Sequence, residues 1–235
     1  MQMLCSGNLH TTKVPQMDKF NDTNSFWIDK WKNQKIGFHN YTPHPFLIEC
    51  IQSFNLNCGD AVFVPLCGKT SDISWLLDQG YHVVGVDLSE VAINALFDEL
   101  GLRPTITKKP HFSCYRAPMI DVFVGDLFNL ETAMLPKINL VYDRAALVAL
   151  PPKRQAEYAL FVTTLTDSAP QMIVTIEFDD LLINSPPYSV KQDDLYRIYG
   201  TEYTLSLIRQ SFDKLGLKGK FPVTETCWAC APVPT

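Results

Sequence analysis

The sequence lacks the features that mark membrane proteins and nucleic-acid-binding proteins. No apolar run approaches the roughly 18 residues that span a bilayer, and no charged start followed by an apolar stretch opens the chain. Lys and Arg number 20 against 25 Asp and Glu, a net charge of −5, and no basic stripe is present. A protein that binds a phosphate backbone normally has such a stripe. We therefore expect no nucleic-acid partner and no membrane association.

The number and spacing of the cysteines fit neither a disulfide framework nor a metal site. The seven cysteines are odd in number and scattered, which favours free thiols and a cytoplasmic location. Cys227 and Cys230 form a C-x-x-C pair, but their segment alternates like a strand, which places the two sulfurs on opposite faces. Because no second Cys or His pair lies nearby, we interpret both as structural and predict no metal.

Length and composition fit one globular α/β domain. The chain has 235 residues, of which 46% are hydrophobic and 19% charged, enough for a substantial core. Residues 1–24 show no periodicity and predict a flexible leader, so the expected domain covers residues 25–235. We expect it to be a monomer. A short helix is predicted from Ser25, as N-cap, to Asn33.

The rest of the chain alternates between short apolar runs and helical segments. This alternation predicts a doubly wound, mostly parallel, Rossmann-like sheet. The last two apolar runs have no helix between them and predict an antiparallel C-terminal strand pair. The expected strands are residues 61–65, 82–87, 121–124, 138–142, 171–177, 203–212 and 224–231, and the expected helices 44–54, 72–79, 90–100, 152–166 and 192–199.

A ligand of a doubly wound sheet binds beyond the carboxyl ends of the strands. Gly68 follows the first expected strand, and Asp87 ends the second, about 20 positions later. At this spacing Asp87 can accept hydrogen bonds from ribose hydroxyls, or it can cap the next helix. The first turn carries one glycine instead of G-x-G-x-x-G, which disfavours a dinucleotide, whose pyrophosphate needs close backbone approach. S-adenosylmethionine has no phosphate and is favoured.

Three further positions have two interpretations each. Asp126 ends the third expected strand, where it can approach an adenine edge or serve as a simple turn residue. Trp27 and Trp31 are four residues apart and share one helix face, either as core or as an aromatic cover for a sulfonium. His39, which follows Phe38, is interpreted as a structural histidine with satisfied hydrogen bonds.

Several separated motifs together resemble the thiopurine S-methyltransferase family, most closely its bacterial members. The resemblance is good over about residues 26–166 and loose beyond, and it implies a class I S-adenosylmethionine-dependent methyltransferase fold. The matching stretches are FWIDKW (26–31), QKIGFH (34–39), VPLCGK (64–69), GYHVVGVDLS (80–89), GDLF (125–128) and YDRAALVALP (142–151).

The resemblance also implies roles for particular residues. It places Phe38 and Arg144 on the methyl-transfer side, with Arg144 near both cofactor and acceptor. It implies methyl transfer to the sulfur of a small aromatic or heterocyclic thiol, leaving S-adenosylhomocysteine. The family usually has Glu where this chain has Asp87, and its C-terminal substrate residues do not carry over. The residues that match its cofactor site are Trp27, Trp31, Leu66, Gly68, Asp87 and Leu127.

Other acceptors and other functions remain as alternatives. Selenium or tellurium species, other small thiols and halides are acceptors of similar kind, and a non-catalytic S-adenosylmethionine-binding module is another possibility. A nicotinamide-dependent oxidoreductase needs a glycine-rich turn, and Tyr-x-x-x-Lys is its common catalytic signature; neither is present. A methyltransferase of nucleic-acid amino groups usually has an Asn/Asp-Pro-Pro-Tyr/Phe turn where this chain has Asp143-Arg144-Ala145.

The expected mechanism assigns Arg144 to the acceptor. Methyl transfer is an in-line displacement, so the enzyme mainly aligns the reactants and excludes water. Because a thiolate is a strong nucleophile, a dedicated general base is not required. Our hypothesis is that Arg144 lowers the pKa of the acceptor or orients it, and that Asp143 holds Arg144.

Overall fold

The computed structural model describes residues 20–183 and 185–234, and its centre is one nine-stranded sheet. The five central strands run parallel, and strands at both edges pair antiparallel. The strands are β1 (Ala61–Pro65), β2 (His82–Asp87), β3 (Thr105–Lys108), β4 (Phe112–Ala117), β5 (Ile120–Gly125), β6 (Leu140–Arg144), β7 (Gln171–Glu177), β8 (Tyr203–Leu217) and β9 (Phe221–Pro232). Their order across the sheet is β3-β4-β5-β2-β1-β6-β7-β9-β8.

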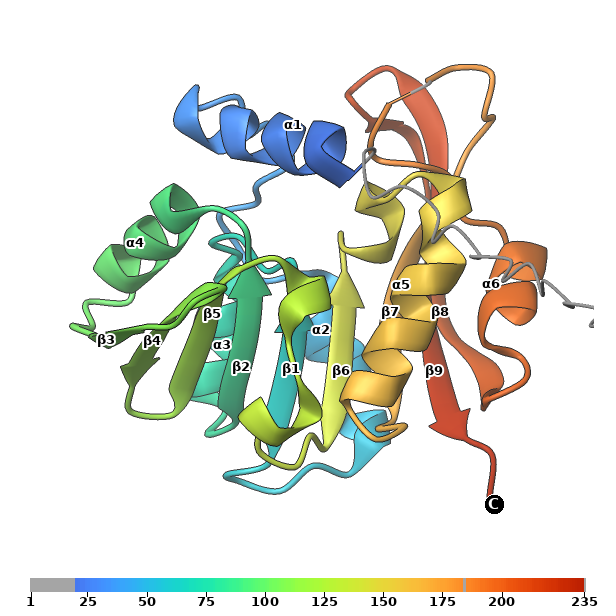
Figure 1. Ribbon diagram of the computed structural model, residues 1–235. Helices are drawn as coiled ribbons and strands as arrows, with labels where there is room; N and C mark the ends of the chain where they lie inside the picture. The colour runs from blue at the N-terminus through green and yellow to red at the C-terminus, as the bar shows by residue number, and fades with distance from the viewer. Residues whose placement is uncertain (1–19, 184, 235) are drawn as a thin grey trace, which may run out of the picture.

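Helices cover both faces of the sheet, as predicted for a doubly wound fold. In β1, Val62 and Val64 pack toward α2, α3 and α4, whereas Phe63 packs toward α5 and α6. This alternation buries the whole strand, which explains its continuous apolar run. Figure 1 shows α1 lying across the edge where the parallel strands end. The helices are α1 (Phe20–Lys32), α2 (Pro45–Cys50), α3 (Ser71–Asp78), α4 (Glu90–Glu99), α5 (Pro152–Leu165) and α6 (Gln192–Tyr199).

Capping residues fix the helix starts that follow the first two strands. The Thr70 hydroxyl accepts the N–H of Asp72 at the start of α3, and the Ser89 hydroxyl accepts the N–H of Ala92 in α4. Gly80 has φ +84° just beyond α3, as expected for a helix C-terminus. These caps anchor the loops that leave β1 and β2.

Two features differ from the predictions. Helix α1 begins at Phe20, so Ser25 lies inside it and is not its N-cap; residues 21–25 are all N-cap types, which leaves the sequence without a unique start. Residues 20–24, which were predicted to belong to a flexible leader, are therefore helical, and residues 1–19 lie outside the described residues. The β3–β4 hairpin was not predicted, and it adds two antiparallel strands beside β5.

The C-terminal strand pair has the predicted pairing and side-chain alternation. Strands β8 and β9 pair antiparallel, and β9 joins the sheet through β7. Cys227 belongs to the core under α2 and α3, and Cys230 to the core under α5, so their sulfurs lie on opposite faces. Within residues 20–183 and 185–234, no group of His, Cys, Asp and Glu is arranged to hold a metal ion. No helix in the same ranges is long and apolar enough to cross a membrane.

Candidate active site

A cavity of about 1040 Å³ opens at the carboxyl ends of the parallel strands. It lies at the topological switch point of the sheet, between β1 and β6, where the order of the strands reverses. The loops after β1, β2, β5, β6 and β7, helix α1 and the β8–β9 hairpin contribute to its wall. All nine sequence-predicted site residues line it: Trp27, Trp31, Phe38, Leu66, Gly68, Asp87, Asp126, Leu127 and Arg144.

Asp87 is a buried carboxylate at the end of β2, held by two backbone groups. One oxygen accepts the N–H of Gly68 at 2.8 Å, and the other accepts the N–H of Ser89 at 2.8 Å. The side chain is therefore not the N-cap of α4; that role belongs to Ser89. Burial raises the pKa of Asp87 to about 6, although its backbone hydrogen bonds oppose the shift. Each oxygen keeps a lone pair for a further donor in the cavity.

The loop after β1 presses against the indole ring of Trp31. Gly68 has φ +50°, and a Cβ added there would lie 2.6 Å from the Trp31 ring. Leu66, two residues earlier, also has a positive φ, of +48°. Non-glycine residues seldom adopt this conformation, and such strain concentrates at functional sites. The close approach makes Trp31 the partner that fixes the loop carrying Leu66 and Gly68.

Gly68→Ala is expected to lower the free energy of unfolding by about 2–4 kcal/mol, because a methyl group adds overlap with Trp31 to an unfavourable φ. Gly101→Ala is the matched control, since Gly101 has φ +66° with open space around it. Chemical denaturation of both variants measures the difference. Equal losses would show that the contact with Trp31 contributes nothing.

Aromatic rings form a cluster in the wall of the cavity. The ring of Phe38 meets those of Trp27 and Trp31 edge-on, with centroids 5.4 Å apart in each pair. Trp31 is buried, while Trp27 is half-buried and Phe38 is 38% exposed. Within the described chain, the buried indole N–H of Trp27 has no hydrogen-bond partner. The cluster thus offers ring faces and one free donor in the cavity wall.

Asp126 joins the loop after β5 to helix α1. Its two oxygens accept from the N–H of Phe128 and from the side-chain amide of Asn24, at 3.1 Å and 2.9 Å. The first bond caps a short 3-10 turn, which was the simpler of the two interpretations. Leu127 in that turn is buried against the cavity. Asp126 therefore serves the turn and also lines the pocket.

The predicted pairing of Asp143 with Arg144 is wrong. Asp143 accepts from the N–H of Leu147 at 3.0 Å and from the hydroxyl of Tyr158 at 2.7 Å. Burial raises its pKa to about 6. Neighbouring residues of a strand point to opposite faces, so Asp143 is directed toward α5 and Arg144 away from it. No acidic side chain of the described ranges forms an ion pair with Arg144, which lines the cavity.

His39 and Glu225 are among the titratable cavity residues that were not predicted as site residues. His39 was interpreted as satisfied, but its buried Nε2 has no partner among the described residues. Burial, assisted by the charge of Lys69, lowers its pKa. Glu225 of β9 also lines the cavity. The only sequence signal for His39 was its position next to Phe38. The only one for Glu225 was its spacing of two residues from Cys227, which puts both on one face of the strand.

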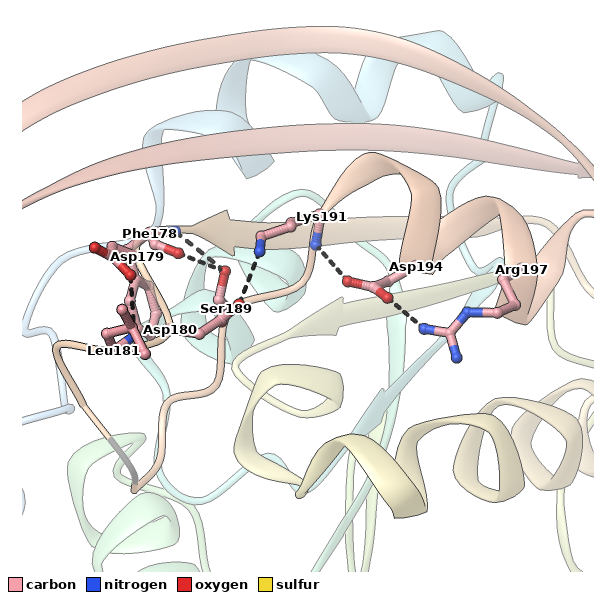
Figure 2. A network of polar contacts seen from close by, with 8 residues as sticks. All are labelled: Phe178, Asp179, Asp180, Leu181, Ser189, Lys191, Asp194 and Arg197. Atoms are coloured by element: carbon pink, nitrogen blue, oxygen red, sulfur yellow. Dashed lines mark hydrogen bonds and ion pairs between the residues drawn. The ribbon is translucent and has the colours of Figure 1, made fainter.

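A polar network holds the ends of the segment that brings Pro186 and Pro187 to the cavity. The Ser189 hydroxyl accepts the N–H of Phe178 and donates to its carbonyl, both at 3.1 Å (Figure 2). Lys191 pairs with Asp180 at 2.7 Å, next to the start of α6 (Figure 2). The base of this segment is therefore tied to β7 and α6.

Comparison with known proteins gives relatives over almost the whole chain. A family model described as thiopurine S-methyltransferase matches residues 22–226. The chain is 43% identical to a thiopurine S-methyltransferase of Teredinibacter turnerae, over 87% of this chain and 95% of that protein. It is 41% identical to one of Xanthobacter autotrophicus, over 86% and 96%.

The fold is similar to that of a solved methyltransferase. The structure is the 1,6-didemethyltoxoflavin-N1-methyltransferase of Burkholderia thailandensis with bound 1,6-didemethyltoxoflavin and S-adenosylhomocysteine. The TM-score is 0.63 with 12% identity, over 94% of this chain and 93% of that one. At this identity the likeness concerns the fold alone, and it supports the predicted class I architecture.

Proposed function

This chain belongs to the thiopurine S-methyltransferase family, and from this premise we propose that it methylates the sulfur of a small aromatic or heterocyclic thiol. It is an enzyme, with S-adenosylmethionine as its methyl donor. The observation that carries the proposal is the single cavity lined by all nine predicted residues. Segments as distant as residues 27 and 144 meet there, at the sheet edge where doubly wound folds bind ligands.

The residues on the β2 side fit the nucleoside part of the cofactor. Asp87 has free lone pairs for ribose hydroxyls, and its backbone bonds hold it in place. Leu127 supplies an apolar wall and Asp126 an acceptor for the adenine end. The ring faces of Trp27 and Trp31 suit a sulfonium, because aromatic faces attract positive charge. The single-glycine loop at Gly68 makes no phosphate cradle.

The residues on the β6 side fit the acceptor. S-adenosylmethionine supplies a methyl carbon already activated by its positive sulfur. Arg144 is placed to orient the acceptor sulfur through a charge-assisted hydrogen bond. Phe38 and the edge-on tryptophans supply an apolar wall, which excludes water from the reacting atoms.

The remaining parts of the proposal concern other acceptors, the oligomeric state and the cellular location. A selenium species fits the same geometry, since selenolates are soft nucleophiles like thiolates. The proposed catalytic domain, residues 25–235 together with the helical residues 20–24, acts as a monomer in the cytoplasm. The six described cysteines are all free thiols, which supports a reducing compartment.

Calorimetry with S-adenosylmethionine, followed by addition of 6-mercaptopurine and detection of S-adenosylhomocysteine, tests the function. We expect binding and turnover. Binding without turnover would overturn the thiol acceptor and direct the search to selenite, other thiols and halides. Absence of binding would contradict the assignment of this cavity to the cofactor.

A further inference from the structure

Glu225 is a carboxylate on the acceptor side of the cavity that the predicted site does not use. It lies on β9, opposite Ile176 of β7 and Ser211 of β8, and its side chain is 31% exposed. Ser211 and Ile176 line the same cavity. One carboxylate oxygen, Oε1, contacts His44. The other, Oε2, has no hydrogen-bond partner within residues 20–183 and 185–234.

His44 holds this carboxylate in a defined orientation. Its side chain is only 6% exposed, and its Nε2 lies 3.1 Å from Glu225 Oε1. Its Nδ1 accepts the N–H of Phe46 at 3.1 Å, so the proton of the neutral ring is on Nε2 and is donated to Glu225. The backbone N–H of His44 is bound to Asp72 at 2.7 Å. The ring is therefore locked at both ends, and Glu225 is locked with it.

Glu225 and Arg144 lie on the same face of the sheet, with one strand between them. Arg144 pairs with Val174 and Glu225 with Ile176, two residues further along β7. Strand spacing and rise place their Cα atoms about 12 Å apart. Tyr142 and Cys227, each two residues from one of them, share the core beneath this face. A small ring and the two side chains together span such a distance.

We propose that Glu225, positioned by His44, receives the proton that a neutral heterocyclic thiol or thione releases when its sulfur is methylated. This inference rests on the proposed function and assigns its substrate class. The acceptor side then presents the guanidinium of Arg144 and the carboxylate of Glu225, which His44 holds. A neutral ring with an S–H or an N–H beside its thiocarbonyl satisfies both, whereas selenite and halides are anions that the Glu225 carboxylate repels.

The step balances in atoms and electrons. The acceptor sulfur forms a bond to the methyl carbon, and the bond from that carbon to the sulfonium breaks, leaving its electron pair on S-adenosylhomocysteine. The S–H or N–H proton of the acceptor passes to Glu225 Oε2 and then to water. Arg144 faces the sulfur while this occurs.

Glu225→Gln is expected to lower kcat/KM for 6-mercaptopurine about tenfold, because the amide cannot take a proton. The affinity for S-adenosylhomocysteine stays unchanged. Pentafluorothiophenol, already ionised at neutral pH, has no proton to release, so its rate stays equal or rises in the variant. Glu49→Gln is the matched control, since Glu49 pairs with Arg209 outside the cavity. His44→Asn keeps a helix cap but removes the Nε2–H, and we expect a smaller loss than in Glu225→Gln.

The outcomes separate this inference from the function on which it rests. A wild-type enzyme that methylates 6-mercaptopurine, with an undiminished Glu225→Gln variant, would overturn the inference alone. Equal losses for both thiols would also overturn it, since they indicate a structural role. A wild-type enzyme without activity on any thiol would overturn the proposed function, and the inference with it.

Discussion

Asp87→Ala is expected to weaken S-adenosylmethionine binding about a thousandfold, the largest effect of any single change considered for this enzyme. The variant loses two hydrogen bonds from ribose hydroxyls to a charged acceptor, each contributing about 1.5–3 kcal/mol. It also frees the N–H groups of Gly68 and Ser89, which hold the loops after β1 and β2. Calorimetric titration with S-adenosylhomocysteine measures the loss.

Asp87→Glu is the matched control, because the family usually has Glu at this position. It keeps the charge, so we expect its affinity to stay within about tenfold of the wild type. Asp179→Ala, at an exposed turn outside the cavity, should leave the affinity unchanged. An Asp87→Ala variant that folds and binds like the wild type would exclude Asp87 from the cofactor site.

The pH dependence gives a second measurement on the same residue. Burial raises the pKa of Asp87 to about 6, so at pH 5 roughly nine-tenths of the carboxyl is protonated and affinity falls about tenfold. Asp87→Asn should be insensitive over this range. Stability has the opposite sign: the folded state binds this proton more tightly than the unfolded chain, so the contribution of Asp87 decreases as the pH rises from about 4 through 6.

The parts of the fold that carry local signals were predictable from sequence. Strands β1, β2 and β7 have the predicted bounds, because each is a continuous apolar run between turn residues. Ser89 is recognisable as a cap from sequence, and Thr70 is one of three adjacent candidates with Ser71 and Asp72, because such side chains satisfy the first free N–H groups of a helix. These elements place Gly68 and Asp87, so the cofactor half of the site was already implied.

The β3–β4 hairpin has no comparable signal. All four residues of β3, Thr105–Lys108, are exposed, so no buried face produces an alternating pattern. The strand forms because β4 (Phe112–Ala117) pairs with β5 and offers its other edge. Edge pairing of this kind depends on tertiary context, which a local pattern does not contain.

The acceptor side was predicted less well because its geometry depends on which way each side chain points. Asp143 and Arg144 are adjacent in sequence, yet the strand directs them to opposite faces. The partner of Asp143 is therefore the hydroxyl of Tyr158 in α5, and not Arg144 as predicted. Glu225 is 181 residues from His44, and only the assembled sheet brings them together. A contact between a helix cap and a distant strand leaves no periodic pattern in the sequence.

Arg144→Ala is expected to lower kcat/KM for 6-mercaptopurine about a hundredfold, with the affinity for S-adenosylhomocysteine within about threefold of the wild type. Arg144 ends β6 and lines the cavity, and the following Ala145 has φ +63°, which turns the chain where the strand ends. Without an ion-pair partner in the described chain, its guanidinium is available to the acceptor sulfur. Steady-state kinetics at pH 6 and pH 8 measure the effect.

The two pH values distinguish how Arg144 acts. If it stabilises the thiolate, the loss is larger at pH 6, where more of the free acceptor keeps its proton, than at pH 8. If it only orients the acceptor, the loss is equal at both. Arg144→Lys keeps the charge but not the planar fork, so it retains activity in the first case and loses it in the second. Unchanged kcat/KM in Arg144→Ala at both pH values would exclude any part of Arg144 in methyl transfer.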